Sequence, residues 1–429
     1  MREDPLLPLD RVEFDYENAF FDDFTGGVDF DSWYICNAAW GVDNGGVIKE
    51  NVSYTDDGVL ALTGNGNYYS GPLKGVGSRT DGTKTGAALI SKFLVGPGRY
   101  EIKMKPHPRL GTCSALWTFA YDESNTDNNH EIDIEMSGDF TYRHIYNTSW
   151  LSDSGTGVRE YYITEVDPVN DGNWHVFGFD WYEDHIDYYI DGEFVQKGTA
   201  IIPYLQSRLW IGVWFPQGWG GEANFETDQM LVDWVKYIPF KDQKITAYEP
   251  TPNTYVGRAD YPSHPTALPK INKLANASFT VPIKATVEET AVNAWRGGLL
   301  ATATSDNITE LVTWGEGYGK DGGCGAQLKE GGYLAQYVDA VYENYEYKLS
   351  FYAKATGSGS RARLMFYPAQ DNVLETHDVT IAGEEWQYYE LIVTAPVNTD
   401  RIRIRLDSAA GSILNISDMK LTFLREIQA

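Results

Sequence analysis

Hydrophobic and polar residues alternate in short runs along most of this chain. Between residues 86 and 240 the runs are interrupted by Gly, Asn, Asp and Pro, and none has the apolar spacing of an amphipathic helix. Gly58–Leu62 alternates in the same way after an Asp-Asp-Gly turn. Because successive side chains of a strand point to opposite faces, this pattern predicts an all-β fold, built as a sandwich of two sheets.

A second series of strand-like runs occupies the C-terminal part of the chain. These runs recur at the spacing of a jelly roll: Asn276–Phe279, Tyr347–Lys354, Trp386–Glu390, Arg401–Leu406 and Ile416–Leu421. Between the two series, prolines without hydrophobic periodicity are typical of a semi-rigid linker. At 429 residues the chain can hold two domains, each with its own core. We expect a leader at 1–17, a first domain at 18–240, a linker at 241–270 and a smaller β-sandwich at 271–429.

The most informative run is His130-Glu131-Ile132-Asp133-Ile134-Glu135-Met136. In a strand its three acids share one face and its two isoleucines share the other. In a helix, acids two and four residues apart would instead spread around the circumference. Because the isoleucines can be buried in a core, the sequence predicts a strand that holds three acids side by side.

Glycoside hydrolysis with retention of configuration requires such a group of acids. It uses a carboxylate nucleophile and a carboxylic acid about 5–5.5 Å apart. Strand positions four apart are about 13 Å from Cα to Cα, and long Glu side chains can close most of that gap by leaning together. Crowding three acids raises at least one pKa, which keeps one glutamic acid protonated as a general acid. The alternative is a solvated acidic strand face, which the motif alone does not exclude.

The charge of the chain narrows its partners. Lys plus Arg number 34 against 61 Asp plus Glu, which gives a formal net charge of −27 and a pI near 4.5. This balance argues against nucleic acid, anionic membranes and polyanionic substrates such as sulfated galactans. Aromatic residues make up 14% of the chain; such rings line sugar-binding clefts, although sheet packing also uses them. The three cysteines, Cys36, Cys113 and Cys324, form no disulfide framework.

The sequence also bears on localisation and on metals. No run approaches 18 apolar residues, the length of a membrane span, and Met1–Pro5 begins no signal peptide. Either the protein is cytoplasmic or its signal sequence is absent from this chain. Because an enzyme that attacks a polymer meets it outside the cell, we expect the second alternative, in a monomeric protein that is secreted or held at the cell surface. No His/Cys cluster has the spacing of zinc ligands, so a metal hydrolase is not expected.

Over about residues 18–240 the chain resembles glycoside hydrolase family 16. The resemblance rests on segments that follow one another in the family's order: Gly86–Lys105, Gly111–Phe119, the acidic strand, Phe179–Trp181, Tyr189–Gly192 and Val232–Tyr237. It implies a concanavalin-like β-jelly-roll sandwich as the catalytic domain. It also implies that Glu131 is the nucleophile, that Glu135 is the acid/base and that Asp133 assists them.

The same resemblance implies three residues that contact the sugar. Trp214 falls at the position of the family's cleft-lining Trp, and Trp219 lies on the loop after it. Asn44 precedes Gly-Gly, as does an Asn that meets the sugar in bacterial licheninases. The alternatives are core packing or loop anchoring for the two rings and a simple turn for Asn44.

Two further strands supply candidate substrate contacts. In 141–150, Tyr146 shares a face with His144, and pairing beside the acidic strand favours this face over the one that carries Ile145. In 113–119, Trp117 faces the same way as Phe119 and is either a sugar contact or a core ring.

Many relatives in family 16 hold a structural Ca²⁺. Carried over to this chain, the ligands are the backbone carbonyls of Asp23 and Gly58 and the side chain of Asp233. Oxygen ligands of mixed type suit Ca²⁺. No cofactor is expected for catalysis.

The spacing within the acidic strand bears on the substrate. Family members with one residue between the Asp and the last Glu include licheninases and xyloglucan enzymes, whereas most laminarinases and agarases carry two, which bulges the strand. Only Ile134 intervenes here. The expected function is a retaining endo-β-glucanase that hydrolyses mixed-linkage β-1,3-1,4-glucan, a neutral polysaccharide. One departure is Ala87–Ile90, an apolar run where licheninases place polar sugar-binding side chains.

Other functions stay open. A laminarinase, a xyloglucan hydrolase or a transglycosylase would use the same acids, and a lectin on the same scaffold is the alternative that is not an enzyme. Residues 271–429 resemble carbohydrate-binding modules of families 4, 9 and 22, although domains of this shape also serve as spacers. Trp295, Trp314 and Tyr318 are the candidate ligand-binding rings of that domain.

Overall fold

Strands dominate the computed structural model of the protein. The residues described are 12–39, 45–76, 84–120, 129–137, 144–153, 156–167, 169–216, 218–250, 255–258, 261, 268, 270–279, 295–299, 311–338, 341–368 and 372–427. The chain divides into two compact units. The first comprises 1–66, 71–223 and 228–268, and the second comprises 269–429 with the short segments 67–70 and 224–227.

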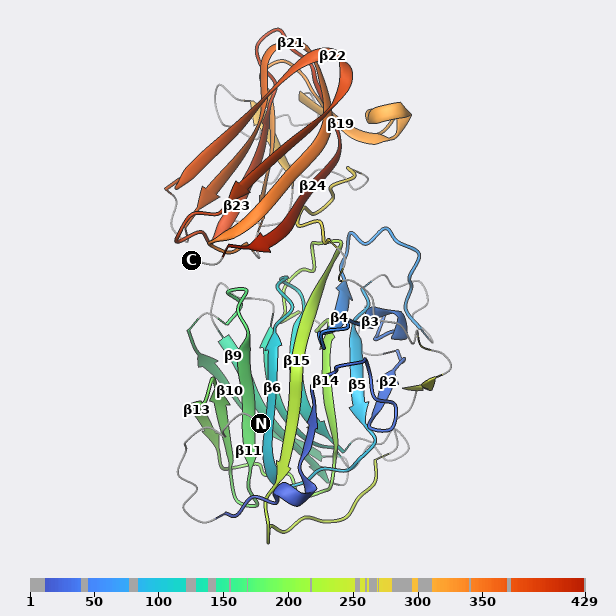
Figure 1. Ribbon diagram of the computed structural model, residues 1–429, viewed down its shortest axis with the longest axis vertical. Coiled ribbons are helices and arrows are strands. Elements are labelled where there is room, and N and C mark those ends of the chain that lie inside the picture. The colour runs from blue at the N-terminus through green and yellow to red at the C-terminus, as the bar shows by residue number, and fades with distance from the viewer. Residues whose placement is uncertain are drawn as a thin grey trace. The chain divides into compact units, whose positions relative to one another are not determined.

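The first unit contains two 3-10 helices and sixteen strands among the described residues (Figure 1). They are η1 (Tyr16–Asn18), β1 (Phe20–Asp22), β2 (Trp33–Cys36), η2 (Lys49–Asn51), β3 (Val52–Tyr54), β4 (Leu60–Asn65), β5 (Ala87–Ser91), β6 (Gly98–Lys105), β7 (Cys113–Phe119), β8 (Asn129–Ser137), β9 (His144–Asp153), β10 (Thr156–Glu165), β11 (His175–Trp181), β12 (Ile186–Ile190), β13 (Glu193–Gly198), β14 (Arg208–Trp214), β15 (Thr227–Pro239) and β16 (Tyr255–Val256).

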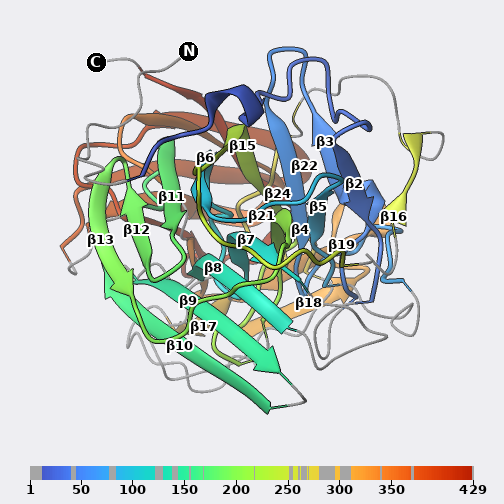
Figure 2. The same ribbon diagram turned by 90° about the horizontal axis from the view of Figure 1, so that it is seen from below.

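These strands form two antiparallel sheets. The first sheet has the order β13-β12-β11-β6-β15-β4-β3, with β1 added beside β15. The second, which we call the acid-bearing sheet, has the order β10-β9-β8-β7-β14-β5-β2-β16 (Figure 2). A continuous apolar core lies between them, with fully buried residues from both, such as Ile132 and Leu116 from one and Ile102 and Phe177 from the other. The predicted all-β sandwich is confirmed.

The alternation of the acidic run follows the prediction for a strand. In β8 the inward-facing set, His130, Ile132, Ile134 and Met136, is at most 1% exposed. The apolar side chains of this set lie in the core between the sheets. Burial of an apolar side chain of this size contributes roughly 1.5–3 kcal/mol. A shift of one residue in register would turn the acids into the core, so the isoleucines fix which face carries them.

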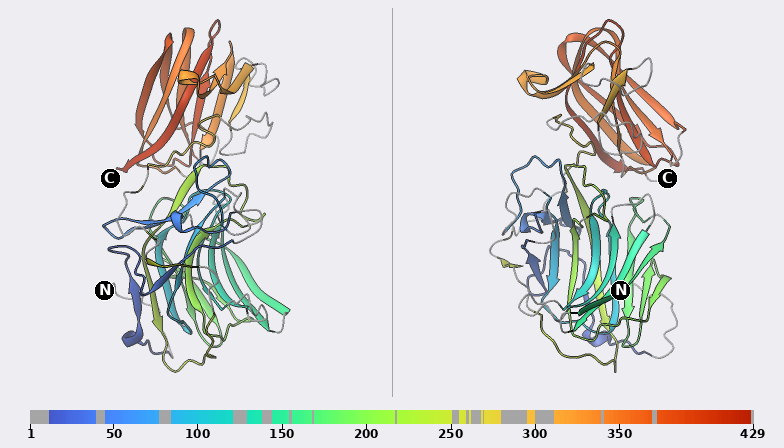
Figure 3. Two further views of the ribbon diagram at one scale, coloured as in Figure 1. Left: turned by 90° about the vertical axis from the view of Figure 1, so that its right-hand side faces the viewer. Right: turned by 180° about the vertical axis from the view of Figure 1, so that it is seen from behind.

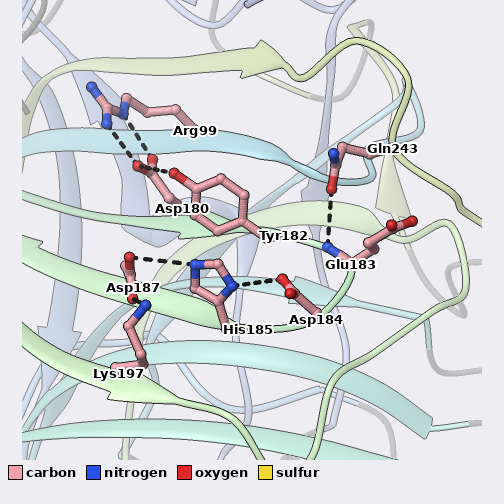
Figure 4. A network of polar contacts seen from close by, with 9 residues as sticks. All are labelled: Arg99, Asp180, Tyr182, Glu183, Asp184, His185, Asp187, Lys197 and Gln243. Atoms are coloured by element: carbon pink, nitrogen blue, oxygen red, sulfur yellow. Dashed lines mark hydrogen bonds and ion pairs between the residues drawn. The ribbon is translucent and has the colours of Figure 1, made fainter. Parts of the chain in front are cut away.

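The first sheet contains a buried ion pair between two of its interior strands (Figure 4). Arg99 and Asp180 are directly opposite each other on β6 and β11 and form a bidentate pair, with N–O distances of 2.7 and 2.6 Å. Their side chains are 2% and 0% exposed. The ring of Phe14 covers the guanidinium at 5.1 Å, and the Tyr182 hydroxyl donates to the same carboxylate. Burial raises the pKa of Asp180 and the contact with Arg99 opposes that rise.

Residues 14 and 15, which were expected to belong to a separate leader, contact the first unit. Phe14 forms an isolated bridge with Phe240, and the amide of Asp15 donates to the Pro239 carbonyl. The described residues before 18 therefore pair with the end of β15. The sequence did not show this because the contact depends on Phe14 covering Arg99, a residue far along the chain.

The predicted linker is also revised. The first compact unit extends to residue 268. Strand β16 pairs with β2, where the ring of Tyr255 lies 4.3 Å from that of Tyr34. The side chain of Tyr261 is 8% exposed and its hydroxyl donates to the Val52 carbonyl. Tyr255 and Tyr261 thus attach the described part of this segment to the first unit.

The second unit is a separate, smaller β-sandwich with its own core (Figure 3). Its elements are β17 (Arg296–Leu299), β18 (Val312–Glu316), η6 (Lys320–Gly322), β19 (Cys324–Leu328), β20 (Gly332–Val338), β21 (Tyr345–Tyr367), β22 (Glu375–Thr394), β23 (Arg401–Asp407) and β24 (Leu414–Glu426). The strand order is β17-β20-β23-β21-β24-β19-β18, with β22 paired to β21. Trp295 is 2% exposed and donates to the Asn276 carbonyl, so this candidate ligand ring belongs to the core. Trp314 packs against the same core.

The buried ion pair yields a stability prediction. Arg99→Met leaves the Asp180 carboxylate buried without its partner, and we expect the first unit to lose about 3–5 kcal/mol of unfolding free energy. The double variant R99M/D180L replaces both charges with apolar groups and should recover most of that loss. Urea unfolding measures both. As a control, Lys241→Met breaks the exposed pair with Glu13 and should leave the urea midpoint nearly unchanged. A double variant as unstable as R99M would contradict this account.

Candidate active site

Strand β8 carries its three acids on the face that points away from the core. It lies between β7 and β9 in the acid-bearing sheet. Glu131 and Glu135 are half-buried, and Asp133 between them is 4% exposed. Because strand register is unshifted along β8 on both sides, the three carboxyl groups form one straight row.

The neighbouring strands place aromatic residues beside this row. On β7 the partners of Glu131, Asp133 and Glu135 are Phe119, Trp117 and Ala115. On β9 the partners are Trp150, Thr148 and Tyr146. Directly opposite residues of adjacent strands share a face. The strand that contains Tyr146 therefore pairs beside the acids in the expected register; the side chains of Tyr146 and His144 lie outside the described residues.

Hydrogen bonds distinguish the two glutamates. Burial raises the pKa of Glu131, the charge of Glu135 raises it further, and hydrogen bonds from Asp133 and Asn129 lower it. Burial raises the pKa of Glu135 as well, and only a hydrogen bond from Cys113 opposes the rise. Both pKa values are raised, that of Glu131 to about 8 and that of Glu135 to about 7, so each carboxyl group binds a proton more tightly than an isolated one.

Asp133 is the central proton holder of the row. Burial raises the pKa of its carboxyl well above the ordinary range, and the charges of Glu131 and Glu135 add to the effect. A protonated Asp133 donates a hydrogen bond to the Glu131 carboxylate. Three acids can stay side by side in this setting because they retain protons that isolated carboxyl groups would lose at neutral pH.

Cys113 is a functional candidate that the sequence reasoning missed. Its sulfur lies 3.6 Å from Oε1 of Glu135, and the residue is fully buried. Burial and the charge of Glu135 raise the pKa of the thiol well above its usual range, so the S–H is retained and donates to the carboxylate. The side chain of Trp214, the cross-strand partner of Cys113, in turn hydrogen-bonds the sulfur. The signal in the sequence was the alternation of Cys113, Ala115 and Trp117 on the strand before the acids.

Indole rings flank the same face of the sheet. Trp214 is half-buried and meets the 40% exposed Trp219 edge to face at 6.0 Å. Trp210, four residues before Trp214 on β14, stacks on Trp117 at 5.4 Å. Trp210 was not singled out from the sequence, although its spacing from Trp214 places it on the same face. Trp117 is 4% exposed, so it is a packed ring beside Asp133.

Gly212 and two apolar residues complete this surface next to the tryptophans. Between Trp210 and Trp214, a Cβ at Gly212 would lie 2.7 Å from the Ala87 carbonyl oxygen, so the strands approach closely only with glycine there. Ala88 and Ile90 on β5 are fully buried in a cluster with Trp117 and Cys113. Two residues of the apolar run Ala87–Ile90 thus pack with these rings. Licheninases place polar sugar-binding side chains on this strand instead.

Asn44, a predicted sugar contact, lies outside the described residues. His130 is fully buried on the core side of β8, where Nδ1 accepts from the Tyr204 amide.

No helix of the described residues is long and apolar enough to cross a membrane.

The predicted calcium ligands are brought together only in part. Gly58 has φ +85° and lies against Asp23, since a Cβ there would come within 2.7 Å of the Asp23 carbonyl oxygen. The Asp233 carboxylate is paired instead with Lys103, at 2.6 Å from its Nζ. Within the ranges described, no three His, Cys, Asp or Glu side chains gather as a metal-binding group.

Comparison with known proteins agrees with this geometry. The sequence model of glycosyl hydrolases family 16 matches residues 46–236, which include the acidic row. A beta-glucanase of Acetivibrio thermocellus is 32% identical over 182 residues, 41% of this chain and 50% of that protein. A beta-glucanase of Paenibacillus macerans is 30% identical over 217 residues, 48% of this chain and 84% of that protein. The match thus spans half of the first relative and most of the second.

A solved structure gives a similar alignment. The Bacillus licheniformis beta-glucanase aligns with 52% of this chain and 99% of its own, at 22% identity and a TM-score of 0.43.

Proposed function

Because the chain belongs to glycosyl hydrolase family 16, we propose that it is a retaining endo-β-glucanase whose reaction takes place at the acidic row of β8. The observation that carries the proposal is the unequal hydrogen bonding of Glu131 and Glu135 within one row of half-buried acids. Retaining hydrolysis needs one carboxyl group ionised and the other protonated, and this row provides a different environment for each.

We assign the roles from the family and from the donors around each glutamate. Glu131, which accepts hydrogen bonds from Asp133 and Asn129, acts as the carboxylate that attacks the anomeric carbon. Glu135 gives its proton to the oxygen of the departing sugar, and a covalent glycosyl-enzyme forms on Glu131. Glu135, now a carboxylate, takes a proton from water, and the resulting hydroxide releases the sugar and regenerates Glu131. Protonated Asp133 donates a hydrogen bond to the Glu131 carboxylate, which stabilises the nucleophile while it carries charge.

We propose mixed-linkage β-1,3-1,4-glucan as the substrate. One residue separates Asp133 from Glu135, and β8 pairs with both neighbours without a bulge between Glu131 and Glu135. The formal net charge of −27 favours a neutral polymer. Trp214 and Trp219 offer aromatic surface on which the apolar face of a glucose ring can stack. A polymer of this size is met outside the cell, which supports secretion or surface display.

One panel of polysaccharides tests this substrate. We expect rapid cleavage of mixed-linkage glucan at β-1,4 bonds that follow a β-1,3 linkage, with short oligosaccharides as products. Laminarin, xyloglucan, agarose and carrageenan should be cleaved at least about tenfold more slowly, which corresponds to about 1.4 kcal/mol in transition-state binding. Product sizes are read by chromatography. Faster cleavage of laminarin or xyloglucan would overturn the substrate, and cleavage of a galactan alone would also overturn the argument from charge.

The contact between Cys113 and Glu135 yields a pH prediction. Cys113→Val removes a donor that favours the charged form of Glu135, so the pKa of Glu135 should rise. The basic limb of the kcat/KM profile, which requires a protonated Glu135, should then move to higher pH. Because S–H is a weak donor, we expect about half a pH unit, or about 0.7 kcal/mol.

Cys113→Ser is the matched control, since its hydroxyl retains a donor at the same position. Its basic limb should stay within about 0.2 pH units of the native protein. Melting temperatures of all three proteins separate a packing effect from a shift in pKa. Identical basic limbs for the native, Val and Ser proteins would show that Cys113 does not influence the acid.

We also propose that Ca²⁺ stabilises the first unit without taking part in catalysis. Asp23 and Gly58 present adjacent backbone, and Asp233 would supply a carboxylate once Lys103 is displaced. Bound Ca²⁺ supplies charge neutralisation at this place and no chemistry for the acidic row. A ligand that binds only the native state adds about 2.7 kcal/mol at a hundredfold excess over Kd.

Melting curves with chelator and then with CaCl₂ test this metal site. Ca²⁺ should raise the melting temperature, and Lys103→Met should enlarge the rise because it frees the Asp233 carboxylate. Lys236→Met, which breaks the neighbouring pair with Glu101, should leave the response to Ca²⁺ unchanged. The absence of any rise in both the native protein and K103M would remove Asp233 from the metal ligands.

A further inference from the structure

The second unit concentrates its arginines on one side of a sheet. Residues 270–429 contain seven arginines: Arg296, Arg361, Arg363, Arg401, Arg403, Arg405 and Arg425. Strand register places five of them on adjacent strands, Arg361 and Arg363 on β21 opposite Asp407 and Arg405 of β23, and Arg401 and Arg403 along the same row of β23. Every second residue of a strand points to the same face, so these five share one face.

The opposite face of these strands is the core. On β23 the alternate residues Ile402, Ile404 and Leu406 are fully buried, as are Leu364 and Phe366 on β21. The arginines therefore point away from the core. Their side chains are accessible in varying degree, with Arg361 41%, Arg363 20% and Arg405 21% exposed.

Tyrosines hold the guanidinium groups in place. Tyr337 on β20 lies under Arg401 at 5.0 Å and under Arg403 at 5.1 Å. Tyr333, also on β20, lies under Arg405 at 4.9 Å. A guanidinium stacked on a ring keeps its N–H edges available for hydrogen bonding. Because the side chain is already ordered, it loses little further conformational freedom on binding. Tyr367, opposite Arg401 on β21, lies 5.9 Å from the Arg401 guanidinium. We call these five arginines with Tyr333, Tyr337 and Tyr367 the arginine–tyrosine face.

Among the described residues, two acids form ion pairs with arginines of this face. Asp407 contacts Arg361, Arg363 and Arg405, and Asp378 contacts Arg361 and Arg363. The face therefore carries an excess of positive charge on a chain whose formal net charge is −27. A surface of the opposite sign to the rest of the molecule selects an anionic partner.

From this arrangement we propose that the arginine–tyrosine face binds an anionic polysaccharide whose sugar rings carry carboxylate groups. A guanidinium fork matches a planar carboxylate, and Asp407 already shows that pairing with the side chains of this face. Arg401, Arg403 and Arg405 recur about every 6.6 Å along β23, which suits a linear polymer with repeated charges. The first unit belongs to a family that acts on glycans, so a polysaccharide is favoured over nucleic acid.

Such binding would hold the enzyme at a matrix that contains acidic and neutral polysaccharides together. The acidic first unit would cleave the neutral polymer while the second unit stays on the acidic one. Binding at this face is independent of hydrolysis, so its failure would leave the proposed active site unaffected.

Binding of the full chain to polygalacturonate tests the proposal. Affinity electrophoresis in gels with polygalacturonate or with neutral mixed-linkage glucan compares the native protein with R361Q/R403Q. We expect retardation by polygalacturonate that weakens as salt increases from 50 to 200 mM. The double variant should bind at least about tenfold more weakly, given about 1.4 kcal/mol for one charge-assisted hydrogen bond.

Arg425→Gln is the matched control, because Arg425 belongs to the same unit, lies outside this face and is 68% exposed. It should bind within about twofold of the native protein. Circular dichroism and glucan hydrolysis, both unchanged in R361Q/R403Q, would show that the variant is folded. Equal binding by native protein and R361Q/R403Q overturns the proposal, as does binding to neutral glucan alone. Equally strong retardation by double-stranded DNA would show general affinity for polyanions and would also overturn it.

Discussion

Three carboxyl groups in one row constrain everything around them. Side by side on a sheet, Glu131, Asp133 and Glu135 repel one another unless protons and hydrogen-bond donors balance their charges. The protein meets this requirement with Asp133, which stays protonated and donates to Glu131, and with the thiol of Cys113, which donates to Glu135. Because different donors reach them, the two glutamates have different surroundings, and the proposed double-displacement reaction gives them different roles.

The rest of the first unit serves to hold this row. Ile132 and Ile134 anchor β8 in the core, and unshifted pairing with β7 and β9 keeps the acids in line. Rings on β14 and the loop after it cover one side of the row, with Trp214 in contact with both Cys113 and Trp219. The ring proposed to stack on sugar is thereby joined through one sulfur atom to the acid that would protonate the sugar's leaving oxygen.

Alternation along the chain was sufficient to predict β8, its outward acids and the all-β class, because a period of two is a local property. Contacts that depend on register or on distant residues could not be predicted in this way. Cys113 on β7 contacts Glu135 diagonally on the adjacent strand β8, and Lys103 forms an ion pair with the Asp233 carboxylate. Tyr261 anchors a proline-containing segment that composition described as a linker. Trp295 shows the same limit, since an aromatic residue in the sequence does not reveal whether its ring is buried.

The central claim is that Glu131 forms a covalent bond with the sugar. A 2-deoxy-2-fluoro glucoside chain with a reactive leaving group slows both chemical steps, because fluorine destabilises the positively charged transition state, and it slows release of the glycosyl-enzyme more than its formation. Intact-mass spectrometry followed by peptide mapping should show one added glycosyl group, located on Glu131, and no adduct on Glu131→Ala. An adduct on Asp133 or Glu135, or labelling of Glu131→Ala equal to that of the native protein, would contradict the account.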